Sequence, residues 1–102
     1  MMKALFICNQ GMHRSRTAAH IFKNRFETMH AGLFSWEPVT KKQLEWADTI
    51  FVMEEFQREE LAKRFPDVYM QKRILCLDVP DVYHYCQPEL IELLKQRMDK
   101  LS

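Results

Sequence analysis

The chain has 102 residues, of which 47% are hydrophobic and only two are glycine. This length and composition predict one ordered domain over residues 1–102 and exclude a disordered chain. The net charge of +1 does not by itself predict a polyanionic partner, so we expect no binding to nucleic acid.

Signals for membranes and for disulfides are also weak. No apolar stretch approaches the ~18 residues that span a bilayer, and the N-terminal apolar segment is too short for a signal peptide. We therefore expect no membrane partner. The three cysteines lack the paired spacing of a disulfide framework. Free thiols suit a reducing compartment, so we expect a cytoplasmic protein.

The first half of the chain predicts two strands and two helices. Residues 3–8 are short and apolar, which indicates a buried parallel strand. From Ser15 onward a helical stripe is predicted, because apolar residues recur three, four, seven and eleven positions later, at Ala18, Ala19, Phe22 and Phe26. Residues 30–34 are a weaker candidate for a second strand. Thr40 and Gln43 then fit a capping box, which predicts a short helix with Leu44 and Ala47 inward.

The second half repeats the alternation of strand and helix. Residues 49–53 are apolar and β-branched, and residues 73–77 form a similar run, so both are predicted strands. Between them we predict a helix over residues 54–65 that ends before Pro66, with Phe56, Leu61 and Phe65 as core anchors. A polar loop over residues 78–87 precedes a C-terminal helix that Pro88 opens.

Alternating strands and helices predict an α/β protein with a small parallel sheet and helices on both faces. In such sheets ligands bind beyond the carboxyl ends of the strands. The loop after residues 3–8 and the loop of residues 78–87 both follow strands, so they should open at the same edge of the sheet.

The first of these loops has the pattern of an anion-binding site. Cys8 ends the predicted strand, five residues follow, and Arg14 and Ser15 begin the helix. Amide hydrogens of so short a loop can converge on one anion, and the helix N-terminus adds a partial positive charge. Arg14 can grip two phosphoryl oxygens at once, and Ser15 can donate to the sulfur. The pattern therefore predicts a nucleophilic thiolate beside an oxyanion site.

Residues 5–15, LFICNQGMHRS, resemble the phosphate-binding loop of the low-molecular-weight protein tyrosine phosphatases. The resemblance continues at Ala31-Gly32, at ADTIFVM over residues 47–53 and at DVPDVY over residues 78–83, in the order of the family. These features are similar to a compact, bacterial-type branch. Gly11, His13 and Arg16 depart from the usual residues of the loop, and the connection between residues 33 and 49 is short.

The resemblance implies a four-stranded parallel sheet with flavodoxin-like winding, and hydrolysis of phosphotyrosine or aryl phosphates through a phosphocysteine, without metal or cofactor. It implies Cys8 as nucleophile, Arg14 as oxyanion clamp and Asp81 as general acid, with Asp78 as the rival acid. Tyr83 and Tyr85 are expected to flank an aromatic substrate, or to cover the loop. Expected ligands are a phosphorylated protein, a small aryl phosphate, or inorganic phosphate or sulfate. The expected phosphate-binding residues are Asn9, Gln10, Gly11, Met12, His13, Arg14 and Ser15.

Three other interpretations stay open from sequence. Related proteins reduce arsenate on the same loop, which needs further thiols, and Cys76 and Cys86 are the candidates. The departures at Gly11 and Arg16 would also suit a non-catalytic module that binds phosphate or phosphoproteins. A metal site built from Cys8, His13, His84 and Cys86 lacks the usual paired spacing, so no metal is expected.

Overall fold

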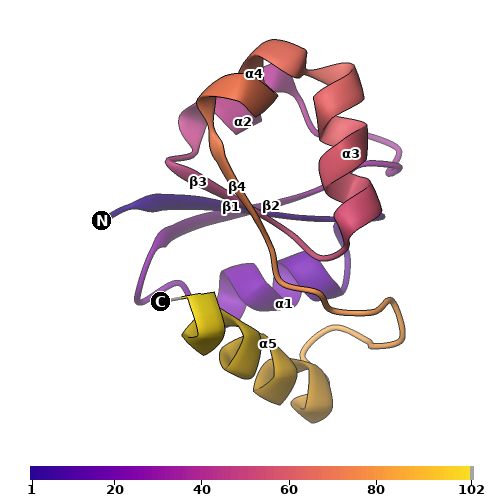
Figure 1. Cartoon of the computed structure of the whole chain (residues 1–102). Helices are drawn as coiled ribbons and strands as arrows, with labels where there is room; N and C mark the ends of the chain where they lie inside the picture. The colour runs from indigo at the N-terminus through magenta and orange to yellow at the C-terminus, as the bar shows by residue number, and fades with distance from the viewer. Residues whose placement is uncertain (102) are drawn as a thin grey trace.

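The computed structural model describes residues 1–101 and contains one sheet of four parallel strands (Figure 1). The strands are ordered β2-β1-β3-β4, so β1 lies between two neighbours, and its residues 4–8 are all buried. The predicted α/β architecture with four parallel strands is confirmed. The strands are β1 (Lys3–Cys8), β2 (Glu27–Gly32), β3 (Thr49–Val52) and β4 (Arg73–Cys76).

Helices cover both faces of this sheet, as predicted. In Figure 1 α1 and α5 lie on one face, and α2, α3 and α4 lie on the other. Alternation along β1 divides its side chains between two cores: Phe6 packs toward α1 and α5, whereas Leu5 and Ile7 pack toward the other helices. The helices are α1 (Arg14–Ile21), α2 (Lys41–Trp46), α3 (Glu55–Arg64), α4 (Pro66–Gln71) and α5 (Pro88–Leu101).

The second strand, β2, has other bounds than the predicted range of 30–34. It begins at Glu27 rather than at residue 30 and ends at Gly32, so Leu33 and Phe34 lie beyond it. β2 is an edge strand whose first four residues are exposed or half-buried, and only Ala31 and Gly32 are buried. A prediction that follows apolar runs therefore finds only its buried end. β3 and β4 each end one residue earlier than predicted.

Three predictions about helices also needed correction. α1 ends at Ile21, and Phe26 packs against the core from the turn that follows the helix. Pro66 does end α3, but it also opens α4 in the favourable first position, which was not predicted. Phe56 is 44% exposed and is no core anchor. The inner face of α3 instead contains Gln57 and, one turn later, Leu61.

The remaining local predictions agree with the structure. The capping box of α2 is present, because Thr40 Oγ1 accepts from the Gln43 N–H at 3.2 Å and Gln43 Oε1 accepts from the Thr40 N–H at 3.0 Å. Within residues 1–101, no helix has both the length and the apolar character that crossing a bilayer requires.

Candidate active site

The loop of residues 9–13 joins the carboxyl end of β1 to the N-terminus of α1, and it contacts the Cys8 sulfur through Gly11. The Gly11 N–H donates to Cys8 Sγ at 3.2 Å, and Ser15 Oγ lies 3.1 Å from the same sulfur. The sulfur thus accepts from one amide of the loop and lies beside the Ser15 hydroxyl. Both donors are suited to stabilise a thiolate.

The loop lies directly on the end of β2, and two glycines permit this approach. A Cβ on Gly32 would lie 2.5 Å from the carbonyl carbon of Gln10, and a Cβ on Gly11 would lie 2.8 Å from that of Ala31. Gly11 also has a φ of 71°, in the left-handed region that favours glycine. The Leu33 N–H donates to the Cys8 carbonyl at 3.0 Å. The strand end and the loop therefore pack backbone against backbone.

The start of α3 holds the other side of the loop through Gln57, a residue that the sequence did not single out. Its side chain has no exposed surface. Gln57 Nε2 donates to Asn9 Oδ1 at 2.9 Å, while Gln57 Oε1 accepts from the N–H groups of Met53 at 2.8 Å and Glu54 at 2.9 Å. One buried amide thus joins the loop to the end of β3.

Arg14 occupies the centre of the site and is only 1% exposed. Its Nη1 donates to Glu54 Oε2 at 2.7 Å and to the Val79 carbonyl at 2.8 Å. Its Nε and Nη2 are buried and have no hydrogen-bond partner within residues 1–101. These two nitrogens form one fork of the guanidinium group, the geometry that binds two oxygens of a carboxylate or phosphate.

Asp81 is the acid of the 78–87 loop that reaches this fork. Its Oδ2 lies 3.6 Å from Arg14 Nη2, and the carboxylate is more than half exposed. Asp78 instead lies where the chain leaves β4, has a φ of 57°, and accepts from Arg97 Nε through its carbonyl at 3.2 Å. Of these two acidic residues, Asp81 is therefore the one whose carboxylate is shown beside Arg14.

The rest of the 78–87 loop rests on α1 and on the core. Tyr83 is partly buried and packs against the core cluster around Phe6. The Tyr85 ring centroid lies 4.0 Å from the Arg16 guanidinium. The backbone N–H of Tyr85 donates to His13 Nδ1 at 3.1 Å. Tyr85 thus contacts the loop at His13 and Tyr83 contacts the core, and contact with a substrate stays a prediction for both.

The thiols and possible metal ligands do not form a centre of their own. Cys8, Cys76 and Cys86 are free. The His13 and His84 rings meet edge to face at 5.6 Å. Among residues 1–101 no three side chains of histidine, cysteine or acid converge in a way that could hold a metal ion.

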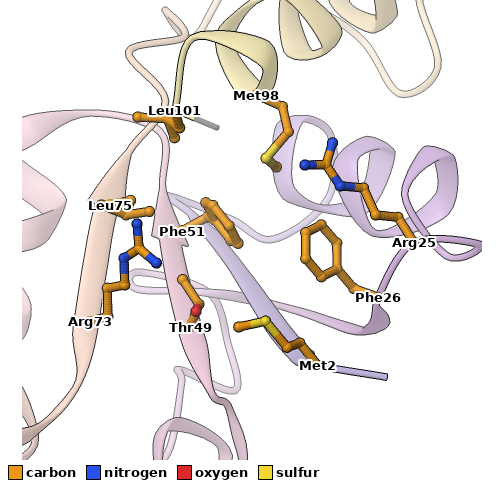
Figure 2. Close-up of a pocket in the computed structure, with 9 residues that line it drawn as sticks. All are labelled: Met2, Arg25, Phe26, Thr49, Phe51, Arg73, Leu75, Met98 and Leu101. Carbon is orange, nitrogen blue, oxygen red and sulfur yellow. The ribbon is translucent and has the colours of Figure 1, made fainter.

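A cavity of about 170 Å³ lies at the opposite edge of the sheet (Figure 2). Thr49 and Arg73, which begin β3 and β4, line it, so it opens at the amino ends of the strands. Its floor is apolar and includes Phe26 and Phe51, with Arg25 and Arg73 beside it (Figure 2). The described residues that line it include no cysteine, histidine or acidic side chain, and the Cys8 loop remains the candidate site.

Sequence reasoning missed Glu54 and Gln57, although a signal existed. Both follow β3, which neighbours β1 in the sheet, so both lie near the carboxyl end of β1. Gln57 also precedes Leu61 by four positions, which places a polar side chain on the buried face of α3. A polar residue on a buried face at the ligand edge of a sheet is a candidate for positioning a site.

No family model matches the chain, and no curated protein matches it. Its structure does match solved structures across nearly its whole length. The fold is that of the low-molecular-weight protein tyrosine phosphatases, as the sequence resemblance implies.

Three solved structures illustrate the match. The tyrosine phosphatase Wzb from Escherichia coli K30, in complex with phosphate, has a TM-score of 0.80 at 15% identity and covers 99% of this chain and 96% of its own. SP-PTP from Streptococcus pyogenes has a TM-score of 0.80 at 16% identity, with coverage of 99% and 91%. The YwlE arginine phosphatase from Geobacillus stearothermophilus has a TM-score of 0.74 at 18% identity, with coverage of 99% and 93%.

Proposed function

We propose that the chain is a cysteine-dependent phosphomonoester hydrolase that acts on phosphotyrosine or other aryl phosphates. The observation that supports this most is Arg14. Its fork of Nε and Nη2 is buried without a hydrogen-bond partner, at the end of a loop whose Gly11 N–H donates to the Cys8 sulfur. Buried polar donors without partners are rare and destabilising, so this fork is suited to an oxyanion. An oxyanion there would lie next to the nucleophile.

The proposed reaction has two steps. In the first, the Cys8 thiolate attacks phosphorus in line, the bond to the leaving oxygen breaks, and Asp81 gives that oxygen its proton. In the second, Asp81 takes a proton from water, the water oxygen bonds to phosphorus, and the sulfur–phosphorus bond breaks. Inorganic phosphate and the Cys8 thiolate are released. Arg14 and the loop amides bind the non-bridging oxygens in both steps.

A covalent intermediate has a parallel among the structural neighbours. A cysteine-to-serine mutant of the YwlE arginine phosphatase, 21% identical with a TM-score of 0.74, has a phosphorylated active-site serine. For this chain we assign the corresponding chemical role to Cys8, because it is the thiol that accepts from an amide of the loop. We therefore infer a phosphocysteine intermediate.

Exposed apolar side chains near the loop support an aryl substrate. Met12 belongs to the loop, and Phe34 lies next to it because the Phe34 N–H donates to the Asn9 carbonyl at 2.8 Å. Val82 follows Asp81 directly. All three side chains are exposed. Apolar surface around an oxyanion site favours a substrate whose phosphate is attached to an apolar ring.

Para-nitrophenyl phosphate is the first substrate to assay, followed by phosphotyrosine and phosphoserine peptides. We expect turnover by the wild type, none by Cys8→Ser, and retained binding of inorganic phosphate by Cys8→Ser. Arg14→Lys removes both donors of the fork, Nε and Nη2, and each lost oxyanion donor lowers the rate about 10²–10³-fold. We therefore expect this variant to lower kcat/KM by about 10⁴-fold. Hydrolysis by Cys8→Ser at the rate of the wild type would contradict the mechanism. Phosphate binding without turnover would instead indicate a non-catalytic module.

Arsenate reduction receives less support from the placement of the thiols. Cys76 packs in the core on the side of α2, α3 and α4, whereas the Cys86 N–H donates to Thr17 Oγ1 on α1 at 2.8 Å. Two thiols on different faces of the sheet are poorly placed to relay a disulfide with Cys8.

A phosphorylated protein as partner and a cytoplasmic location stay predictions.

A further inference from the structure

His30 contacts the candidate loop from the edge of the sheet. It lies on β2, two residues before the strand ends, and its side chain is exposed. Its Nδ1 lies 2.9 Å from the Gly11 carbonyl oxygen. A carbonyl can only accept, so Nδ1 must carry the hydrogen in this contact.

This contact fixes the orientation of one peptide group of the loop. In a trans peptide the carbonyl oxygen of Gly11 and the N–H of Met12 point in opposite directions. Holding the carbonyl toward β2 therefore turns the Met12 N–H away from β2. The Gly11 N–H already donates to Cys8 Sγ, so two successive amides of the loop would face the interior of the loop.

Glycine makes this contact necessary. Gly11 has a φ of 71° and no side chain, so neighbouring peptide groups rotate more freely about it than about other residues. If the Gly11–Met12 peptide turned over, a carbonyl oxygen would point into the oxyanion site and repel the anion. A hydrogen bond from outside the loop opposes this rotation.

We propose that His30 is a positioning residue that holds the Gly11 carbonyl out of the oxyanion site, so that the Met12 N–H faces the phosphoryl oxygens. This role rests on the proposed function, because it serves an anion bound in the loop. His30 itself does not touch the reacting atoms. It acts through the backbone, from the exposed edge of the sheet.

Two substitutions and one control test this role. His30→Ala removes the donor. His30→Asn keeps one, because Asn Nδ2 and His Nδ1 are each attached to Cγ. The control is Glu27→Ala, another exposed position on β2. Permanent loss of one oxyanion donor lowers rates about 10²–10³-fold, and the peptide would be misoriented most, but not all, of the time. We therefore expect His30→Ala to lower kcat/KM for para-nitrophenyl phosphate by about 10- to 100-fold.

The same variants are compared for inhibition by inorganic phosphate and for thermal stability. We expect phosphate to bind His30→Ala about tenfold more weakly, with the melting temperature near that of the wild type. His30→Asn should recover most of both losses, and Glu27→Ala should show neither. The role is refuted if His30→Ala stays within about twofold of the wild type, or if His30→Asn is no better than His30→Ala.

An NMR measurement separates failure of this role from failure of the proposed function. Nitrogen-15 spectra should show His30 protonated at Nδ1, and the Met12 amide should shift when inorganic phosphate is added. A neutral ring protonated only at Nε2 would overturn the role whatever the activity. If the wild type binds phosphate without turnover, the proposed function fails, and the phosphate affinities of the two His30 variants still decide the role.

Discussion

Replacing Gly32 by alanine is the sharpest test of how the candidate loop is seated. The added Cβ would lie 2.5 Å from the Gln10 carbonyl carbon and 2.8 Å from the Gly11 nitrogen. Non-bonded carbons prefer about 3.5–4.0 Å, so the loop must move by roughly 1 Å. Both neighbours are backbone atoms, which cannot rotate away as a side chain can. Such a displacement should lower kcat/KM by about 10²-fold and destabilise the fold by about 1–3 kcal/mol.

The assay is hydrolysis of para-nitrophenyl phosphate, measured beside unfolding in urea. Leu94→Val on α5 is the matched control, because that fully buried side chain lies in the core and its truncation costs about 1 kcal/mol. The control should lose stability and keep its kcat/KM. If Gly32→Ala keeps both the activity and the stability of the wild type, the loop does not rest on β2 as described.

Three further substitutions test the acid, the buried amide and a thiol. Asp81→Asn should change kcat little for para-nitrophenyl phosphate but lower it about 10²-fold for phenyl phosphate, whose leaving group needs the proton; equal effects on both substrates would contradict the role of the acid. Gln57→Leu leaves the Met53 and Glu54 N–H groups without their acceptor, so urea unfolding should show a loss of about 2 kcal/mol or more, and an unchanged midpoint would refute the contact. Burial raises the pKa of the Cys76 thiol above its ordinary value of 9.0. The unfolded chain then loses this proton first, so stability falls as the pH rises from the ordinary pKa through the folded one. Cys76→Ala should show a smaller fall in stability above the ordinary pKa of 9.0, and an equal fall would assign the pH dependence to other groups.

The part of the site that is local in sequence could be predicted without a structure. Cys8 and Ser15 are seven residues apart, and a strand, a short loop and a helix leave little freedom in how they meet. Their separation of 3.1 Å agrees with that expectation. The position of Asp81 near Arg14 was anticipated from the order of the loops and from the family resemblance, and the structure places the two 3.6 Å apart.

The parts that depend on strand register could not be predicted. His30 faces the loop because β2 pairs with β1 so that Cys8 lies opposite Gly32, and no local pattern reveals this register. The half-exposed residues of β2 also hide the strand from a search for apolar runs. Similarly, Glu54 follows β3, and the local sequence indicates only an acidic residue that favours a helix N-terminus. Its contact with Arg14 spans forty positions of sequence.

Arg14 links three segments that are far apart in the chain. Through Nη1 it binds Glu54 at the start of α3 and the Val79 carbonyl in the loop that contains Asp81. These two bonds fix the plane of the guanidinium group, so they also fix the direction of the Nε and Nη2 fork. Because Val79 precedes Asp81 by only two residues, a shift of that loop would displace the acid and rotate the fork together. In the proposed reaction, oxyanion binding and proton donation would therefore both depend on the Val79 carbonyl, and a change in α3 or in the 78–87 loop should disturb both.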